Sequence, residues 1–389
     1  MRAAMLLSGL MLAACAQAPA APITAPSSAT TIASLNEGVW LKGDLHIHSR
    51  HSKDSSNNPV SNIIAFGKSV GVDFLAITDH DNHVEGAIAE HTWADPEFTS
   101  DSILLLYGAE WTTHRGHGTP LSATPYDHQK FYDVRDERDV KVGAVKNELG
   151  LHLSANHPGG NDHFGFSYDI VDSMEVWNSA VWSRNAASIM IWDDMLKSGR
   201  MMTARGGSDS HHGFPPTPEE ATDLSWQAPA NNVGTPTTWV FAAARTSQAV
   251  IDALTNGRAS ISANPHAPRV EFHADLDADG AMDMMMGDNA TATGGPVAFR
   301  VQLTGATPAG AVYTVSVVKN GSPFGAFETT GATPTATFTD TPAVDTRTYY
   351  RVTVEGTPTP YPEVPESQQR SGNMIGLSNP IYFNFDPGF

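Results

Sequence analysis

Two pairs of metal-binding residue types stand one residue apart in this chain: His46 with His48, and Asp209 with His211. Residues i and i+2 of a β-strand point to the same side, so each pair would project together from the end of a strand. Imidazole nitrogens and carboxylate oxygens are ligands that zinc, iron and manganese accept in proteins. The two pairs therefore predict a site for divalent metal ions.

Further histidines and acids follow other short apolar runs. The full set of candidate ligands, in chain order, is His46, His48, Asp54, His80, Glu110, His117, His157, Asp209 and His211. Carboxylates are rarely buried without a partner, and histidines that only stabilise a core rarely cluster. Together these residues predict a site with more than one metal ion.

The strands that precede these residues must position them. Apolar runs of strand length lie at residues 39–48, 73–78, 103–107, 151–155, 173–177, 201–207 and 238–243. Helical patterns lie at 59–70, 136–149, 185–197 and 247–255. Strands that alternate with helices indicate a parallel sheet, and polar residues at the carboxyl ends of the strands are typical of a (β/α) barrel. We therefore expect an α/β fold with a TIM-like barrel over residues 37–268.

The pattern changes at about residue 269. Alternating apolar and polar residues occur at 299–303, 313–317 and 349–354, and an apolar run at 377–383 resembles a closing strand. Turns rich in Thr, Gly and Pro separate these runs, without a helical pattern between them. This predicts a small all-β sandwich domain over residues 269–389.

The first residues resemble an export signal. Arg2 precedes an apolar stretch at residues 5–12 that is too short to span a bilayer, and Leu12-Ala13-Ala14-Cys15 resembles a bacterial lipobox. We expect residues 1–15 to form a lipoprotein signal with Cys15 as the lipidated residue, and the Ala-, Pro-, Ser- and Thr-rich residues 16–36 to form a tether. An ordinary signal, cut near Ala18 or Ala20, is the alternative. Either implies an exported protein, and the lipobox implies a periplasmic or cell-surface lipoprotein anchored to a bacterial membrane.

Charge and cysteine content exclude other classes. The formal net charge of −19 argues against nucleic acid or an anionic membrane surface as the main partner, which leaves membrane contact to the lipid anchor. Cys15 is the only cysteine, so neither an intramolecular disulfide nor a cysteine-ligated zinc site can form.

One acidic segment resembles the start of a calcium-binding loop. It contains Asp275, Asp277, Asp279 and Asp283, with Gly280 in the turn position. Position twelve is Met286 instead of the bidentate Glu, so we do not expect an EF-hand. A structural calcium ion and a solvated acidic turn remain open.

Five short motifs resemble those of the PHP (polymerase and histidinol phosphatase) superfamily. They are Asp44-Leu45-His46-Ile47-His48, Thr78-Asp79-His80-Asp81, Gly108-Ala109-Glu110, Asn156-His157-Pro158 and Ser208-Asp209-Ser210-His211, in the order of the family. Gly43, the run from Gly108 to Thr113 and Gly116-His117 look like its CehA/McbA-like branch. The resemblance covers about residues 41–263. It implies a distorted (β/α)7 barrel that binds two or three divalent ions (Zn, Mn or Fe).

The resemblance also implies how the ligands are shared. His46, His48, Glu110 and Asp209 would hold the first ion; Glu110, His117 and His157 the second; Asp54, His80 and His211 the third. His114 is an alternative to His117, and His51 is an alternative to Asp54. Glu175 could support a ligand, could pair with Arg184 or Arg205, or could itself bind metal.

The resulting charge suits an anionic ester. Three divalent ions, three carboxylate ligands and one hydroxide leave the site with a charge of about +2. We expect a phosphoesterase in which Glu110 bridges two ions and Arg205 clamps a substrate oxygen, and in which Asp209, or a histidine that does not bind metal directly, exchanges a proton. A structural ion pair is the alternative role for Arg205.

Two other functions stay open. The branch that the chain resembles includes aryl carbamate hydrolases, so the same site could cleave a carbamate or carboxylic ester. Trp226 and Trp239 could then form an apolar wall for an aryl group, or they could be core residues. The chain could also be a non-catalytic, surface-anchored lipoprotein that binds metal without turnover.

Overall fold

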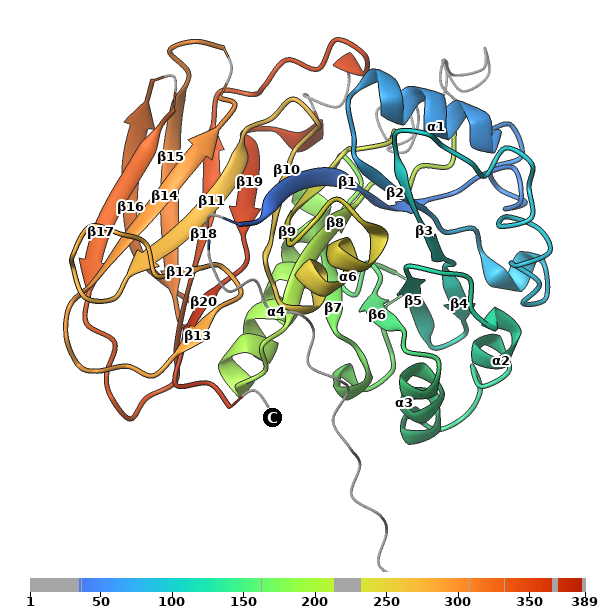
Figure 1. Ribbon diagram of the computed structural model, residues 1–389, viewed down its shortest axis with the longest axis horizontal. Helices are drawn as coiled ribbons and strands as arrows, with labels where there is room; N and C mark the ends of the chain where they lie inside the picture. Colours follow the sequence, from blue (N-terminus) through green and yellow to red (C-terminus); the bar gives the residue numbers. More distant parts are fainter. Residues whose placement is uncertain are drawn as a thin grey trace, which may run out of the picture.

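The computed structural model describes residues 35, 37–161, 163–212, 232–306, 308–331, 333–365 and 370–386 (Figure 1). The predicted lipoprotein signal with Cys15, almost all of the predicted tether, and Trp226 lie outside these residues. Among the described residues, no helix is both long enough and apolar enough to cross a membrane.

The larger part of the molecule precedes residue 263. Its elements, in order, are β1 (Val39–Ile47), α1 (Val60–Ser69), β2 (Phe74–Ile77), η1 (Asp81–His83), β3 (Leu104–Gly108), β4 (Trp111–Thr113), β5 (Gly116–Ser122), α2 (His128–Tyr132), α3 (Asp139–Glu148), β6 (His152–Ala155), η2 (Tyr168–Ile170), β7 (Ser173–Asn178), η3 (Trp182–Asn185), α4 (Ala186–Ser198), β8 (Thr203–Gly207), β9 (Thr237–Ala242), α6 (Ser247–Thr255) and β10 (Ala259–Ser262).

Six of these strands run in one direction. β1, β2 and β3 are parallel neighbours, as are β6, β7 and β8, and antiparallel β5 lies between β3 and β6. The sheet curls, because Ile47 at the end of β1 forms a parallel bridge with Ser210 just after β8. The carboxyl ends of all six strands therefore gather on one side of the molecule.

The prediction of a (β/α)7 barrel is wrong. The structure is mostly β, with 35% strand against 18% helix, and its large sheets are mixed. β5, β9 and β10 are antiparallel to their neighbours in the main sheet. Only 3-10 turns lie between β2 and β3 and between β6 and β7 within the described residues, where a βαβ barrel would need full crossover helices.

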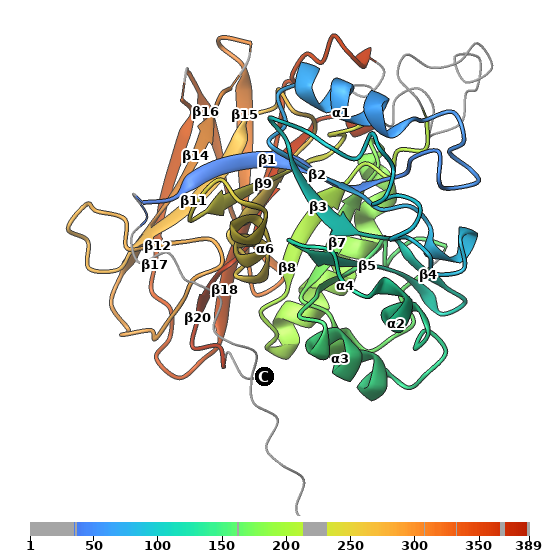
Figure 2. The ribbon, with the colours of Figure 1, turned by 45° about the vertical axis from the view of Figure 1, so that its right-hand side comes forward.

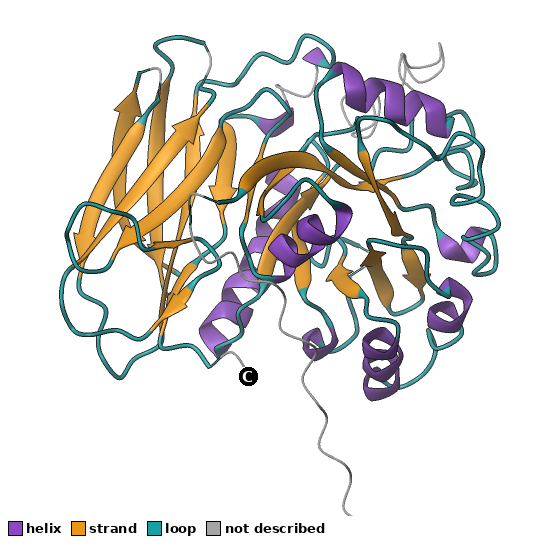
Figure 3. Cartoon of the chain, viewed as in Figure 1, coloured by secondary structure: helices purple, strands orange, loops and turns teal. Residues whose placement is uncertain are grey.

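The C-terminal part consists mainly of strands in two layers (Figure 3). They are β11 (Arg269–Asp275), β12 (Met284–Met285), β13 (Asn289–Ala290), β14 (Val297–Thr304), β15 (Val312–Lys319), β16 (Ser322–Thr330), β17 (Thr335–Asp340), β18 (Thr348–Gly356), β19 (Met374–Ser378) and β20 (Ile381–Phe383). The first layer has the order β12-β11-β14-β17. Alternating buried residues of β14, including Phe299 and Val301, pack against Tyr313, Val315 and Tyr350 of the second layer.

The second layer is not a separate sheet. β19 pairs with β10 (Figure 1), so β18, β19 and β20 extend the main sheet of the N-terminal part without a break. Figure 2 shows β18 and β20 from a view turned by 45°. The prediction of a self-contained sandwich after a barrel is therefore also wrong. A local pattern of alternating residues identifies strands, but it does not reveal that one of them completes the sheet of the preceding segment.

Buried His152 of β6 makes a testable contribution to stability. Its Nδ1 lies 2.9 Å from Oγ1 of Thr255, and its Nε2 lies 2.8 Å from Oγ of Ser173. Burial lowers the pKa of His152 from 6.5 to about 4. The unfolded chain therefore binds one more proton than the folded chain between these two values, and stability falls as pH drops through this window, by roughly 3 kcal/mol.

We expect His152→Gln to lose less stability than the wild type on going from pH 7.5 to pH 4.5, because an amide does not titrate there. Urea unfolding of both proteins at the two pH values, with chelator present, measures the difference. Equal losses in both proteins would contradict the assignment.

Candidate metal centre

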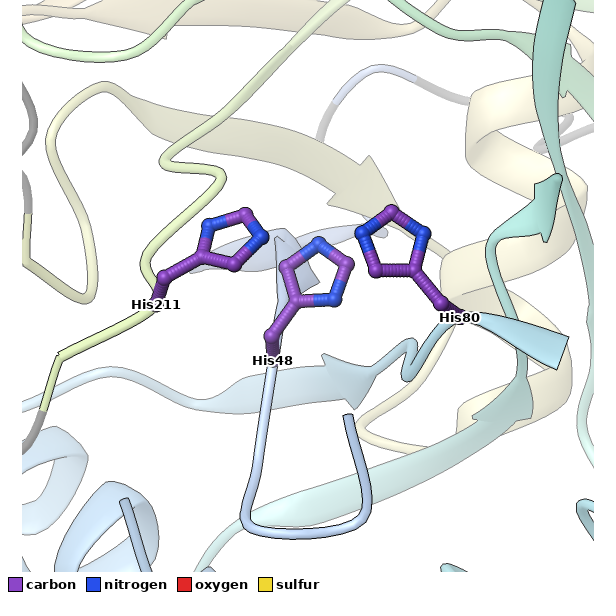
Figure 4. Close-up of side chains that lie close together, drawn as sticks. All are labelled: His48, His80 and His211. Carbon is purple, nitrogen blue, oxygen red and sulfur yellow. The ribbon is translucent and has the colours of Figure 1, made fainter. Parts of the chain in front are cut away.

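The carboxyl ends of the parallel strands carry most of the predicted ligands. His46 is the second-last residue of β1, and His48 directly follows that strand. The segments after β2, β3, β6 and β8 carry His80, Glu110, His157 and the pair Asp209 and His211, while His117 belongs to β5. Because these strands point the same way, their terminal side chains meet. Figure 4 shows three of the imidazoles, those of His48, His80 and His211, lying close together.

One group has the geometry of a first-row metal site. Ligand atoms of His46, His48, Glu110 and Asp209 all lie within 4.8 Å of one another, and all four residues are buried. Nε2 of His46 lies 3.3 Å from Oε1 of Glu110 and 3.4 Å from Oδ1 of Asp209, and Nε2 of His48 lies 3.1 Å from that Oδ1. Four ligands at about 2.1 Å from a tetrahedral ion are about 3.4 Å apart. These residues could hold a metal ion.

A ring nitrogen without a partner also points to an ion. Nε2 of His46 is buried and makes no hydrogen bond, although carboxylate oxygens face it. Nδ1 of His46 lies 3.0 Å from Oε1 of Glu175, which can only accept, so Nδ1 carries the hydrogen. Burial acts to lower the pKa of His46, but Glu175, Asp209 and Glu110 hold it well above its usual value. The position between Nε2 and the two carboxylate oxygens therefore favours a cation, either a proton or a metal ion in its place.

Further groups lie beside the first. Ligand atoms of His48, His80 and His211 form one, and those of His80, Glu110 and His117 form another. Nδ1 of His117 and Nε2 of His157 each lie 3.1 Å from Oε1 of Glu110. Oδ2 of Asp54 lies 3.4 Å from Nε2 of His80 and 3.6 Å from Nε2 of His211. Every predicted ligand is thus brought to one place, with Glu110 between the groups.

The carboxylate of Asp79 supports His48 through the hydroxyl of Ser52. Nδ1 of His48 lies 3.2 Å from Oγ of Ser52, and that hydroxyl donates to Oδ1 of Asp79 at 2.9 Å. The Ser52 hydroxyl also accepts the backbone N–H of His80 at 3.0 Å. Metal-binding histidines commonly donate their second N–H to such a partner, which sets the tautomer and the direction of the ring. Both imidazoles of the first pair are therefore oriented with Nε2 toward the proposed ion.

The electrostatics of the site favour cations. Burial acts to raise the pKa of Glu110 and of Asp209, but the surrounding histidines, His46 first among them, hold both pKa values well below their usual range. Burial together with the neighbouring His211 and His80 lowers the pKa of His48 to about 3. At neutral pH the two carboxylates are therefore anionic and His48 is neutral, the forms that ligate metals.

Two of the proposed ligands have left-handed backbones. His157 has φ of 26° and Asp209 has φ of 53°, a region that residues other than glycine rarely adopt. At Gly207, an added Cβ would lie 2.3 Å from Oε1 of Glu175 and 2.6 Å from Cβ of His46. Bringing these side chains together therefore requires backbone strain at His157 and Asp209 and a glycine at position 207. Such strain is frequent at functional sites.

The ligand groups open into a polar cavity of about 890 Å³. The proposed ligands that line it are Asp54, His80, Glu110, His117, His157, Asp209 and His211. The remaining described residues that line it are His83, Thr112, Gly159, Gly160, Asn161, Asn178, Ser179, Arg184, Asn185 and Ser188. No described lining residue has an apolar side chain, and Arg184 is the only Lys or Arg among them.

No protein-family model, curated protein or solved structure matches the chain. The resemblance of five short motifs to the PHP superfamily therefore remains a prediction. The candidate metal centre is inferred from its own geometry: the buried ligand groups, the unpaired Nε2 of His46 and the carboxylates behind the imidazoles.

The structure distinguishes between the alternative ligands. His114 is 71% exposed and lies 3.3 Å from Asp136, away from the cavity, whereas His117 faces Glu110. Nε2 of His51 lies 2.7 Å from Oδ2 of Asp95. His117 and Asp54 are therefore the members of these two loops that reach the candidate metal centre.

Arg205 does not reach the cavity. Its side chain is fully buried, and its Nη1 donates to Oε1 of Glu175 at 2.9 Å. A clamp on a substrate oxygen would need an exposed guanidinium, so the structure favours the alternative of a structural ion pair. Glu175 pairs with Arg205, and it also contacts Nδ1 of His46, on the ring edge that faces away from the proposed ion.

Sequence reasoning did not identify several supporting residues. Ser52 contacts His48, four residues before it, whereas Asn156 and Asn178 hold Glu110 and Asp209 through hydrogen bonds between segments far apart in the chain. Asn156 and Asp79 lie inside predicted motifs, which could have marked them, but Asn178 is a polar residue at the end of β7 that no motif distinguishes.

The acidic loop at residues 275–283 has fewer features of a metal site than the buried group of histidines and carboxylates. Carboxylate oxygens of Asp275, Asp277 and Asp279 lie within 4.8 Å of one another, so they could hold a cation. Oδ2 of Asp283 instead accepts the backbone N–H of Leu276 at 2.7 Å, and both oxygens of Asp275 accept backbone N–H groups. These bonds are those of an acidic turn, so structural calcium remains a prediction.

Proposed function

We propose that this protein is a metal-dependent hydrolase, and that its substrate is a phosphate ester. The observation that supports this most is the buried group of His46, His48, Glu110 and Asp209, which opens into a polar cavity. Divalent ions held there would lower the pKa of a bound water and stabilise negative charge on phosphoryl oxygens. Zinc, manganese and iron all suit this mixture of imidazole and carboxylate.

The residues of the chain would have distinct tasks. Glu110 lies between the ligand groups and would hold two ions at once. Asp209 borders the cavity, and its Oδ2 accepts a hydrogen bond from Asn178 at 3.2 Å. This carboxylate is therefore placed to exchange a proton with water or with the leaving group.

The cavity favours a polar substrate over an aryl carbamate. Its described lining has no apolar side chain against which an aromatic ring could pack. Trp239 is not part of the lining; Arg269 and Lys42 lie over its ring instead. A carbamate or carboxylic esterase nevertheless remains the second candidate, because the same ions could polarise a carbonyl oxygen.

An activity panel tests the proposal. The purified chain is stripped of metal, reloaded with Zn²⁺, Mn²⁺ or Fe²⁺, and assayed with phosphomonoesters, phosphodiesters and naphthyl carbamates. We expect phosphate-ester hydrolysis that a chelator abolishes and that metal restores. Turnover of carbamates alone would overturn the proposal. Protein with two or more bound ions that is inert on every ester would instead favour a non-catalytic metal-binding lipoprotein.

Arg184 is expected to contribute to substrate binding. It lines the cavity, and a guanidinium there would attract an anionic substrate. We expect Arg184→Met to raise KM for phosphate esters roughly 10-fold or more, with a smaller effect on kcat. Arg245→Met is a matched control, because that side chain pairs with Asp73 at the surface. Equal KM values in wild type and Arg184→Met would contradict the expectation.

A further inference from the structure

A buried ion pair joins two strands directly beneath the candidate metal centre. Glu175 of β7 and Arg205 of β8 are register partners on adjacent parallel strands, and both side chains are fully buried. Nη1 of Arg205 donates to Oε1 of Glu175 at 2.9 Å. Neither residue lines the cavity, so the pair cannot touch a substrate. The pair instead contacts proposed metal ligands and residues that form hydrogen bonds with those ligands.

Glu175 contacts ligands of two different ion positions. Its Oε1 lies 3.0 Å from Nδ1 of His46, which belongs to the first group. Its Oε2 accepts the backbone N–H of His157 at 2.9 Å, and Nε2 of His157 lies 3.1 Å from Oε1 of Glu110. The same Oε2 accepts a hydrogen bond from Nδ2 of Asn178 at 3.1 Å, and that nitrogen also lies 3.2 Å from Oδ2 of Asp209.

Arg205 extends this network to the bridging carboxylate. Its Nη2 donates to Oδ1 of Asn156 at 2.6 Å, and Nδ2 of Asn156 donates to Oε1 of Glu110 at 3.0 Å. Its Nε donates to Oγ of Ser154 at 2.7 Å. The guanidinium is thereby fixed in one orientation. One buried pair thus reaches His46, His157, Asp209 and Glu110 within at most two hydrogen bonds.

We propose that the Arg205–Glu175 pair couples the binding of two metal ions, one held by His46, His48, Glu110 and Asp209 and the other held by Glu110, His117 and His157. The proposal rests on the proposed metal centre and concerns how that centre is loaded. An ion at the first position orders His46 and Asp209. Because Glu175 and Asn156 are held by one guanidinium, ordering the first set also orders His157 and Glu110 for the second ion. The entropic cost of ordering the second set of ligands is then smaller, so the second ion binds more tightly.

The coupling is measured as the ratio of the second to the first stepwise association constant. Metal-free full-length protein is titrated calorimetrically with Zn²⁺ or Mn²⁺, and equilibrium dialysis with elemental analysis counts the bound ions. This ratio contains the repulsion between the two ions in every variant, so a change in the ratio isolates the contribution of the protein. We expect Glu175→Gln to bind two ions with a ratio lowered roughly 5- to 150-fold.

Asn156→Ser provides a second test without any change of charge. It interrupts the path from Arg205 to Glu110 and leaves the ion pair intact, so a lowered ratio is expected here too, even if Glu175→Gln fails to fold. Asp193→Asn is the matched control, because Asp193 pairs with buried Arg351 and neither of these residues lines the cavity. Its ratio should equal that of the wild type.

An unchanged ratio in Asn156→Ser and Glu175→Gln would overturn the proposal, whatever the loss in overall affinity. Coupling is also distinguishable from the hydrolase function. Coupled loading without turnover of any ester would refute only the proposed hydrolase. Phosphate-ester turnover with an unchanged ratio would refute only the coupling.

Discussion

Asp209→Ala is expected to lower kcat/KM for a phosphate ester roughly 10³-fold or more and to remove about one bound ion. Oδ1 of Asp209 lies 3.1 Å from Nε2 of His48 and 3.4 Å from Nε2 of His46, so it completes the first ligand group. Without this carboxylate, two imidazoles and Glu110 would remain, with less negative charge to offset a dication. Metal content by elemental analysis and steady-state kinetics measure the two effects.

His46→Ala should behave in the same way, and His114→Ala supplies the control. His114 is an exposed histidine close in sequence to His117, but it lies beside Asp136 and away from the cavity. Its removal should leave metal content and turnover unchanged. Full metal content in both Asp209→Ala and His46→Ala would refute the assignment of the first ion position.

The second large effect concerns stability, through the buried carboxylate of Asp44. Its side chain is fully buried and accepts the backbone N–H groups of His46 at 3.1 Å, Ser208 at 3.0 Å and Gly234 at 2.8 Å. These bonds join β1 to the segment after β8 and to the segment before β9. Asp44→Ala would leave three buried donors without acceptors, each at a cost of about 1–3 kcal/mol. We expect a loss of roughly 3–6 kcal/mol, which would unfold much of the protein at 37 °C.

Asp44→Asn is the informative companion. The amide keeps one oxygen as an acceptor but turns an N–H group toward a backbone donor, so we expect an intermediate loss. Chemical unfolding of metal-free proteins separates this effect from metal binding. Wild-type stability in Asp44→Ala would show that Asp44 does not join these segments.

Local sequence patterns were sufficient for most of the individual elements around the site. The expected helix at 247–255 has those bounds in α6, and the expected strand at 173–177 is β7. These segments carry the period of their own secondary structure. β5 was missed, because Gly116, Gly118 and Pro120 are poor strand formers and the segment resembles a loop. Its hydrogen bonds to β3 and β6, which lie far from it in the chain, make it a strand.

The fold class could not be obtained in the same way. The direction of β5, β9 and β10 and the junction of β10 with β19 depend on which strands pair, and pairing is a long-range property. A chain that alternates strands and helices favours a barrel on average. This chain instead inserts antiparallel strands and continues its main sheet into the C-terminal layer.

The residue types indicate the chemistry of the candidate site: histidines and carboxylates that stand at or after the carboxyl ends of strands. Which of them meet depends on the tertiary structure, because His46, Glu110 and Asp209 are separated by 64 to 163 positions and are joined only when the sheet curls. The tertiary structure also decided that Arg205 lies beneath the site, where it holds Glu175, and not in the cavity. The sequence does not distinguish an arginine beneath the site from one in the cavity. Its burial and its partners in the structure determine its role.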